Sequence, residues 1–101
     1  MAFRIERTRP YDDDLFLIWL SVSDYSLQRA DRLVRKIESM VDMLAEFPNL
    51  GEAVPQLASN RRRKLCEDYA IYYDVFDETV VILRVLHTAR DLGQFEDLSR
   101  S

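Results

Sequence analysis

The chain has 101 residues, of which 48% are apolar and 32% charged, and its formal net charge is −4. This length and composition are typical of one globular domain and exclude an intrinsically disordered chain. No segment approaches the roughly 18 consecutive apolar residues that a membrane span requires. The basic start, "MAFRIERTRP", is not followed by the apolar stretch of a secretory signal.

Cys66 is the only cysteine, so it cannot form an internal disulfide, and no further ligand residues gather around it to hold zinc. We therefore expect a single domain over residues 1–101, with no metal, no cofactor and no membrane contact, in the reducing cytoplasm.

Charge is distributed unevenly along the sequence. Asp12, Asp13 and Asp14 are consecutive, and Arg61–Lys64 is the strongest basic cluster. Proteins that hold nucleic acid by its phosphates are usually basic, because each neutralised phosphate needs a lysine or an arginine. A chain that is acidic overall can meet nucleic acid only at a local patch.

The first elements along the chain are a short strand and a helix. Apolar and polar residues alternate in "FRIERT", which predicts a strand that ends before Pro10. A helix is predicted from about Tyr11 to Ser23, because its apolar residues follow helical spacing and its acidic first turn suits the helix dipole. The apolar face of this helix consists of Leu15, Ile18, Trp19 and Val22.

A second helix is the clearest element of the sequence. Either Asp24 or Ser26 suits its N-cap, and Pro48 and Gly51 end it. The short connection between the two helices predicts an antiparallel helical hairpin. Apolar residues recur every three or four positions over about five turns, at Leu27, Ala30, Leu33, Val34, Ile37, Met40, Val41 and Leu44.

After Pro55 the pattern changes to the two-residue period of strands. "RRRKLC" predicts a polar edge strand, and "YAIYYDVF" predicts an inner strand rich in aromatic and β-branched residues. A tight turn at Asp77 and Glu78 leads to a last strand from Thr79 to Leu86. The expected fold is α+β, in the order β-α-α-β-β-β, with the helical hairpin on one face of an antiparallel sheet.

Arg84 lies in the middle of this apolar last strand. A guanidinium keeps its proton, so its burial requires an acceptor. Strict alternation directs Val81, Leu83 and Val85 toward the helical hairpin and Arg84 toward the opposite face. The acceptor is expected to be Asp74 on the adjacent strand, the C-terminal segment or a partner, and a structural ion pair is favoured.

Other candidate functional residues lie at strand ends or in the basic cluster. His87 and Arg90 follow the last strand, where loops often carry function, although a single histidine is more often structural than catalytic. Arg61–Lys64 directs two cations to each side of its strand. This cluster fits either a charged edge that resists strand pairing or a patch for an anionic partner. No catalytic triad, glycine-rich phosphate loop or metal-ligand cluster is present.

Three stretches together resemble the RelE/ParE family of toxins from bacterial type II toxin–antitoxin modules, from about Asp13 to Leu92. They are "ADRLVRKIESMVDMLAEFPNLG", "YAIYYDV" and "VVILRVLHTARD". The resemblance is closer to the ParE, plasmid-stabilisation branch than to the RelE branch. It implies the fold expected above and a cognate antitoxin whose disordered tail wraps the toxin, with a heterotetramer as one form of the complex.

The resemblance implies two alternative targets. RelE-type toxins cut messenger RNA on the ribosome, and ParE-type toxins bind and poison DNA gyrase. If the chain were a nuclease, its candidate residues would be Arg61, Arg63, Lys64, Arg84, His87 and Arg90.

Two features favour the gyrase poison, which is not an enzyme. The tail "GQFEDLSRS" offers Phe95 and two acids where an RNA-cutting toxin is expected to offer aromatic hydroxyls and cations. The negative net charge is also unsuited to gripping ribosomal and messenger RNA. The alternatives are a ribosome-dependent mRNA endoribonuclease and a non-toxic remnant that still binds an antitoxin.

The antitoxin is expected to fold into an apolar groove that the two helices and the sheet edge leave uncovered. The candidate antitoxin-binding residues are Leu15, Trp19 and Arg84. Trp19 shares a helix face with other apolar residues, so it is expected in the core or in the lining of this groove.

Overall fold

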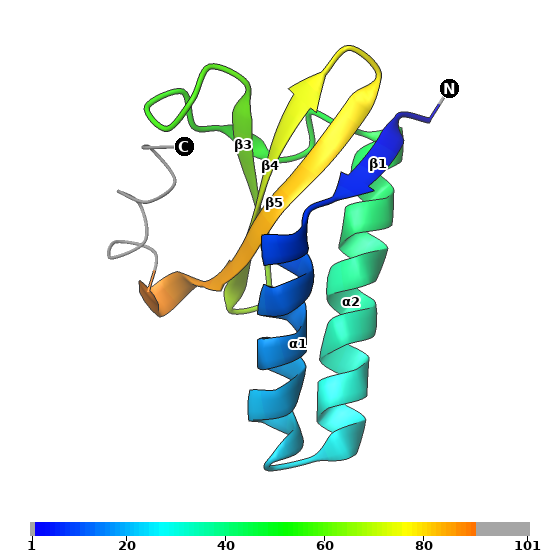
Figure 1. Ribbon diagram of the computed structural model, residues 1–101, viewed down its shortest axis with the longest axis vertical. Coiled ribbons are helices and arrows are strands. Elements are labelled where there is room, and N and C mark those ends of the chain that lie inside the picture. The colour runs from blue at the N-terminus through cyan, green and yellow to red at the C-terminus, as the bar shows by residue number, and fades with distance from the viewer. Residues whose placement is uncertain (1, 91–101) are drawn as a thin grey trace.

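The computed structural model of the chain describes residues 2–90. Two helices lie on one face of a five-stranded sheet whose strand order is β1-β5-β4-β3-β2 (Figure 1). The elements are β1 (Arg4–Arg7), α1 (Arg9–Ser23), α2 (Leu27–Glu46), β2 (Glu52–Ala53), β3 (Arg61–Cys66), β4 (Tyr69–Phe76), β5 (Thr79–His87) and a short 3-10 helix (Thr88–Arg90). The predicted α+β fold with a helical hairpin on one sheet face is confirmed.

The sheet differs from the expected one in two respects. β1 pairs with β5 in parallel, so the sheet is mixed rather than wholly antiparallel. The second difference is β2, which pairs with β3 over two residues, so β3 is not the edge strand that its charges indicated. The edges are β1 and β2, and two residues are too few to produce a recognisable period in the sequence.

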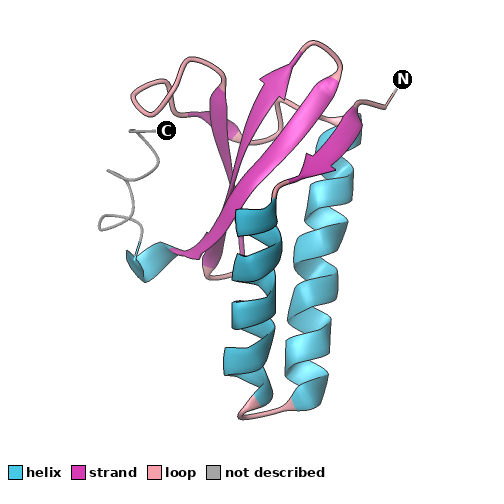
Figure 2. Cartoon of the chain, in the orientation of Figure 1, coloured by secondary structure: helices cyan, strands magenta, loops and turns pink. Residues whose placement is uncertain are grey.

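Both helices begin at side-chain caps. Thr8 caps α1 by accepting a hydrogen bond from the backbone N–H of Tyr11 at 3.3 Å, and Pro10 lies in the first turn. Pro10 therefore starts the helix, because its missing N–H would have no partner there in any case. Ser26, one of the two expected N-caps, accepts from the N–H of Arg29 at 3.2 Å and starts α2. The helices then run side by side as an antiparallel pair (Figure 2).

The main core fills the space between the helical hairpin and the sheet. The helices contribute Tyr11, Ile37, Val41 and Leu44, and the sheet contributes Cys66, Ile71, Tyr73, Val80, Ile82 and Val85. A smaller apolar cluster covers the opposite face of the sheet and consists of Val54, Leu57, Ala70, Tyr72 and Leu86. The sheet centre is thus buried on both faces, as the apolar character of both faces of the last strand predicted.

Gly51 is required where the chain leaves α2 and approaches the sheet. The Tyr73 hydroxyl accepts from the Gly51 N–H at 2.9 Å and donates to the Pro48 carbonyl at 2.8 Å. A Cβ at position 51 would lie 2.6 Å from that hydroxyl and 2.7 Å from the Arg63 carbonyl oxygen, so no other residue fits without movement.

A β-bulge in β5 changes which of its residues face the helices. Tyr73 pairs with Ile82 and Tyr72 pairs with Arg84, which leaves Leu83 as the extra residue. A bulge exchanges the faces of the residues that precede it relative to those that follow it. Val80 and Ile82 therefore face the helices, so the expectation that Val81 and Leu83 do so was wrong, whereas Val85 faces them as predicted.

Neither helix in residues 2–90 combines the length and apolar character that a membrane-spanning helix needs.

Candidate functional site

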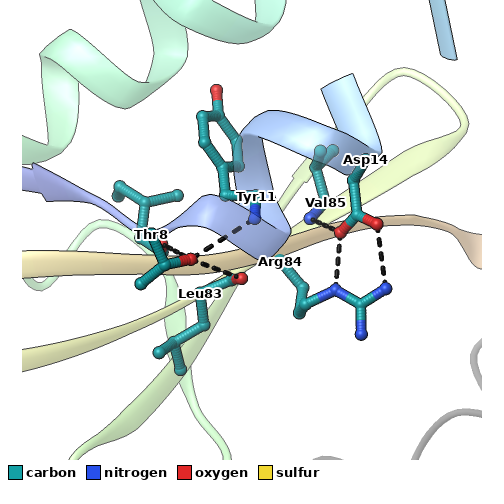
Figure 3. A network of polar contacts seen from close by, with 7 residues as sticks. Thr8, Tyr11, Asp14, Leu83, Arg84 and Val85 are labelled. Atoms are coloured by element: carbon teal, nitrogen blue, oxygen red, sulfur yellow. Dashed lines mark hydrogen bonds and ion pairs between the residues drawn. The ribbon is translucent and has the colours of Figure 1, made fainter. Parts of the chain in front are cut away.

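On one edge the second half of β5 is paired with β4, and on the other edge it is held by α1 rather than by β1. β1 pairs only with Thr79–Ile82. Beyond this point the hydroxyl of Thr8 donates to the carbonyls of Ile82 at 2.9 Å and Leu83 at 3.0 Å (Figure 3). Thr8 therefore caps α1 and also satisfies carbonyl groups on the edge of β5 where its pairing with β1 ends.

Asp14 makes the next contact between α1 and β5. Its carboxylate accepts from Arg84 Nε at 2.6 Å and from Arg84 Nη2 at 2.8 Å, and Oδ2 also accepts from the Val85 N–H at 3.2 Å (Figure 3). Arg84 does form an ion pair, but its partner is Asp14 and not Asp74. Register with Tyr72, which belongs to the smaller apolar cluster, keeps Arg84 on the predicted strand face.

Asp74 is engaged by a different arginine. Arg61 Nε lies 2.6 Å from Asp74 Oδ1, and Arg61 Nη2 lies 3.3 Å from Oδ2. Both side chains are almost fully buried, with 7% and 10% exposed. Arg61 is therefore a structural cation inside the sheet.

The remaining cations of β3 alternate between the two faces of the sheet, as predicted. Arg63 lies in register with Tyr72, and its Nε donates to Glu52 Oε1 of β2 at 2.9 Å. The bond to Glu52 raises the pKa of Arg63. Lys64 lies in register with Ile71, which belongs to the main core, so it is on the helix-facing side of the sheet.

His87 lies at the end of β5 and packs edge-to-face on Tyr69, with ring centroids 5.2 Å apart. Its Nδ1 accepts a hydrogen bond from the Ala89 N–H at 3.1 Å, at the start of the 3-10 helix. With Arg84 and Asp14 it lines a hollow of about 300 Å³ between α1 and β5. Arg90 belongs to the same 3-10 helix, and its side chain lies outside the described residues.

The six nuclease candidates are thus only partly brought together. Arg84 and His87 share one hollow, whereas Arg61 and Arg63 lie two strands away on β3 and Lys64 is on the other face. Arg61, Arg63 and Arg84 each bind a carboxylate of their own chain.

Two of the three antitoxin-binding candidates lie together on the helical hairpin. Leu15 and Trp19 line an apolar hollow of about 430 Å³ between α1 and α2, with Phe16 and Val34. The indole N–H of Trp19 donates to Asp31 Oδ1 at 2.8 Å, which fixes the ring across the two helices. Trp19 is half-buried in the groove lining, and Arg84 lies in the separate hollow.

The sequence reasoning missed two exposed apolar residues of α1, one of which lines this hollow. Phe16 is 60% exposed and Leu20 is 46% exposed, and both follow α1 on the side away from the core. Their signal was present in the sequence, because both are large apolar residues outside the helical stripe that predicted the core.

The family model described as "ParE toxin of type II toxin-antitoxin system, parDE" matches residues 5–92. The chain belongs to the ParE toxin family. It is therefore a toxin of the type II toxin–antitoxin class, and the resemblance to the ParE branch is confirmed.

Two ParE relatives from Caulobacter vibrioides share about a third of their residues with this chain. Toxin ParE3 is 32% identical over 91 residues, covering 89% of this chain and 91% of the relative. Toxin ParE1 is 31% identical over 75 residues, covering 73% of this chain and 77% of the relative.

Solved structures confirm the ParE-like fold at lower sequence identity. The "Chromosomal ParDE TA system from P. aeruginosa" matches with a TM-score of 0.73 and 22% identity, over 85% of this chain and 96% of the other. The toxin–antitoxin complex RelBE2 from Mycobacterium tuberculosis matches with a TM-score of 0.69 and 20% identity, over 86% and 99%.

Proposed function

We propose that this ParE-family toxin inhibits growth by binding and poisoning DNA gyrase in the cytoplasm, and that a cognate antitoxin neutralises it by covering the helical hairpin. The observation that carries the choice of target is the pairing of Arg61, Arg63 and Arg84 with carboxylates of the same chain.

RNA cleavage by attack of a 2′-hydroxyl needs a general base, a proton donor for the leaving oxygen and cations for the crowded phosphate. Arg61 and Arg84 hold their carboxylates through two nitrogens each, which is the strongest form of such a pair. A phosphate would have to displace Asp74 or Asp14 to use these cations, and displacement would leave a partly buried carboxylate without its partner. The arrangement favours structural arginines over a phosphate site.

An antitoxin segment has a suitable surface on α1. Phe16 and Leu20 are exposed, and with the partly buried Leu15 and Trp19 they form an apolar strip along α1 that residues 2–90 leave open. A disordered segment that folds into an amphipathic helix could bury this strip, since such helices present apolar residues every three or four positions. The names of the two solved complexes, ParDE and RelBE2, support an antitoxin partner by analogy.

Purified gyrase and a relaxed plasmid test the proposal. Added toxin should lower the rate of supercoiling in a dose-dependent manner, and prior addition of the antitoxin should restore it. Unchanged supercoiling at every toxin concentration, together with arrested cell-free translation, would favour the mRNA endoribonuclease instead. Antitoxin binding without either inhibition would favour the non-toxic remnant.

A further inference from the structure

The charges of α2 are separated into a basic half and an acidic half. From Leu27 to Lys36 the helix has four basic residues and one acid, a net charge of +3, and from Ile37 to Glu46 it has three acids and no base, a net charge of −3. This order opposes the helix dipole, which favours acids near the N-terminus and bases near the C-terminus. Helix stability therefore does not explain the basic half.

Three of these four cations form no ion pair within the part of the chain that the structure describes. Lys36 binds Glu67 at 2.7 Å, across to the turn between β3 and β4. Arg29, Arg32 and Arg35 are exposed, and within residues 2–90 no carboxylate lies at ion-pair distance from any of the three. Three neighbouring arginines on two helical turns are thus available to an anionic partner.

The cations border a hollow with an apolar floor. Arg29, Arg32 and Lys36 line one side of a hollow of about 520 Å³, and its other lining residues include Val22, Leu33 and Tyr69. The Lys36–Glu67 ion pair fixes the turn against α2 and so forms one wall. This surface therefore presents both positive charge and apolar side chains to a partner.

We propose that this surface, the basic hollow of α2, docks an acidic segment of another protein that also carries apolar side chains. Arg29 and Arg32 are separated by about 4.5 Å along the helix axis, from the 1.5 Å rise per residue. On an extended segment, residues two apart lie about 6.6 Å apart and point to the same side, so two alternate carboxylates would meet these two arginines. The apolar side chains between them would point to the opposite side of the segment, where apolar residues such as Tyr69 line the hollow. The surface is separate from the apolar strip on α1.

Duplex DNA fits this surface less well than an acidic protein segment. A long polyanion would meet the carboxylates of Glu67 and Asp68 at the rim of the hollow and those in the second half of α2. It would also leave the floor formed by Val22 and Leu33 unused, because a phosphate backbone has no apolar side chains to place there.

A labelled peptide of alternating glutamate and leucine is a suitable probe, and fluorescence anisotropy measures its binding to the full chain. We expect binding that weakens as salt is raised, and a loss of about tenfold or more for Arg29→Glu combined with Arg32→Glu. Arg4→Glu combined with Arg9→Glu changes the net charge equally on exposed arginines of β1 and α1, and should leave affinity within about threefold.

A second peptide tests whether the apolar residues of the hollow contribute to binding. A peptide of alternating glutamate and serine should bind more weakly than the leucine peptide if the floor takes part. Equal affinity of these two peptides, equal losses in both double variants, or no binding of the leucine peptide would overturn the proposal. Tighter binding of a short DNA duplex that displaces the peptide would also overturn it and identify a nucleic-acid patch.

Discussion

Asp14 and Arg84 lie 70 positions apart in the chain and form a two-nitrogen ion pair that joins α1 to the part of β5 beyond its pairing with β1, with N–O distances of 2.6 and 2.8 Å. The same carboxylate accepts the Val85 N–H, so it satisfies the strand edge as well as the cation. The arginine that interrupts an otherwise apolar strand is therefore explained by an acid in the first half of α1.

Replacing Asp14 should destabilise the protein in a graded manner. Asp14→Ala removes the carboxylate that binds a partly buried guanidinium and a strand N–H, and should lower the free energy of unfolding by about 2–3 kcal/mol. Asp14→Asn keeps an acceptor for the N–H and should lower it by about half as much. Urea unfolding measures both, with Asp13→Ala, at an exposed neighbouring position, as the control. Asp14→Ala within about 0.5 kcal/mol of the wild type would contradict this role.

The Arg61–Asp74 pair should show the behaviour of buried ions. Arg61→Met leaves the Asp74 carboxylate buried without its partner, so we expect a loss of about 3–5 kcal/mol in unfolding free energy. The double variant Arg61→Met, Asp74→Leu should recover most of that loss, because it removes both desolvated charges. A double-mutant cycle in urea measures the coupling. Additive losses would show that the two side chains do not depend on each other.

Alkaline pH should destabilise the fold through Tyr11. Burial, and then the bond from its hydroxyl to Glu38 Oε2 at 2.8 Å, raise the pKa of Tyr11 above its ordinary value of 10.0. The folded state therefore holds this proton more tightly than the unfolded state, so the stabilisation is complete below about pH 10 and is lost as pH rises above it.

The unfolding free energy should fall by about 1.4 kcal/mol for each pH unit above 10 on account of this one group. Burial raises the pKa of Tyr73 in the same direction, so some alkaline loss should remain in Tyr11→Phe. Thermal melts between neutral and alkaline pH measure the slope, and Tyr25→Phe, at a position that is 88% exposed, serves as the control. An unchanged slope in Tyr11→Phe would contradict the assignment.

Large parts of the fold follow from sequence periodicity. The stripe from Leu27 to Leu44 predicts α2 because it continues over many turns, and the aromatic and β-branched run from Tyr69 predicts β4 in the same way. β2 was missed because two residues carry no period. The faces of β5 were partly wrong because Leu83 is a bulge, and alternation assumes that no residue is inserted.

Side-chain partners were harder to predict than elements. Any of several acids can accept from Arg84, and only the placement of α1 on the edge of β5 selects Asp14. Asp74 was the nearest acid on the adjacent strand, but the register of β3 brings Arg61 directly opposite it. The sequence thus predicted an ion pair for Arg84, but its partner depends on how α1 packs against β5, which the sequence pattern does not show.

The exposed strip on α1 should bind the antitoxin without contributing to folding. Phe16→Ser combined with Leu20→Ser removes apolar side chains that are about half exposed, so the melting temperature should change little. Affinity for the cognate antitoxin should fall by about tenfold or more, since buried aromatic and aliphatic anchors dominate such interfaces. Isothermal titration calorimetry measures the affinity, with Phe76→Ser, at an exposed residue on the end of β4, as the control. Equal affinities for all three proteins would place the antitoxin elsewhere.

The most direct test of the proposed target uses one toxin preparation in two reactions. The first measures plasmid supercoiling by purified gyrase, and the second maps cuts in ribosome-bound messenger RNA by primer extension. Because Arg84, Arg63 and Arg61 are held by carboxylates of the same chain, the wild-type protein should inhibit supercoiling and leave the messenger RNA intact. Cuts at the ribosomal A site with supercoiling unchanged would contradict the proposal and identify the arginines as a catalytic set.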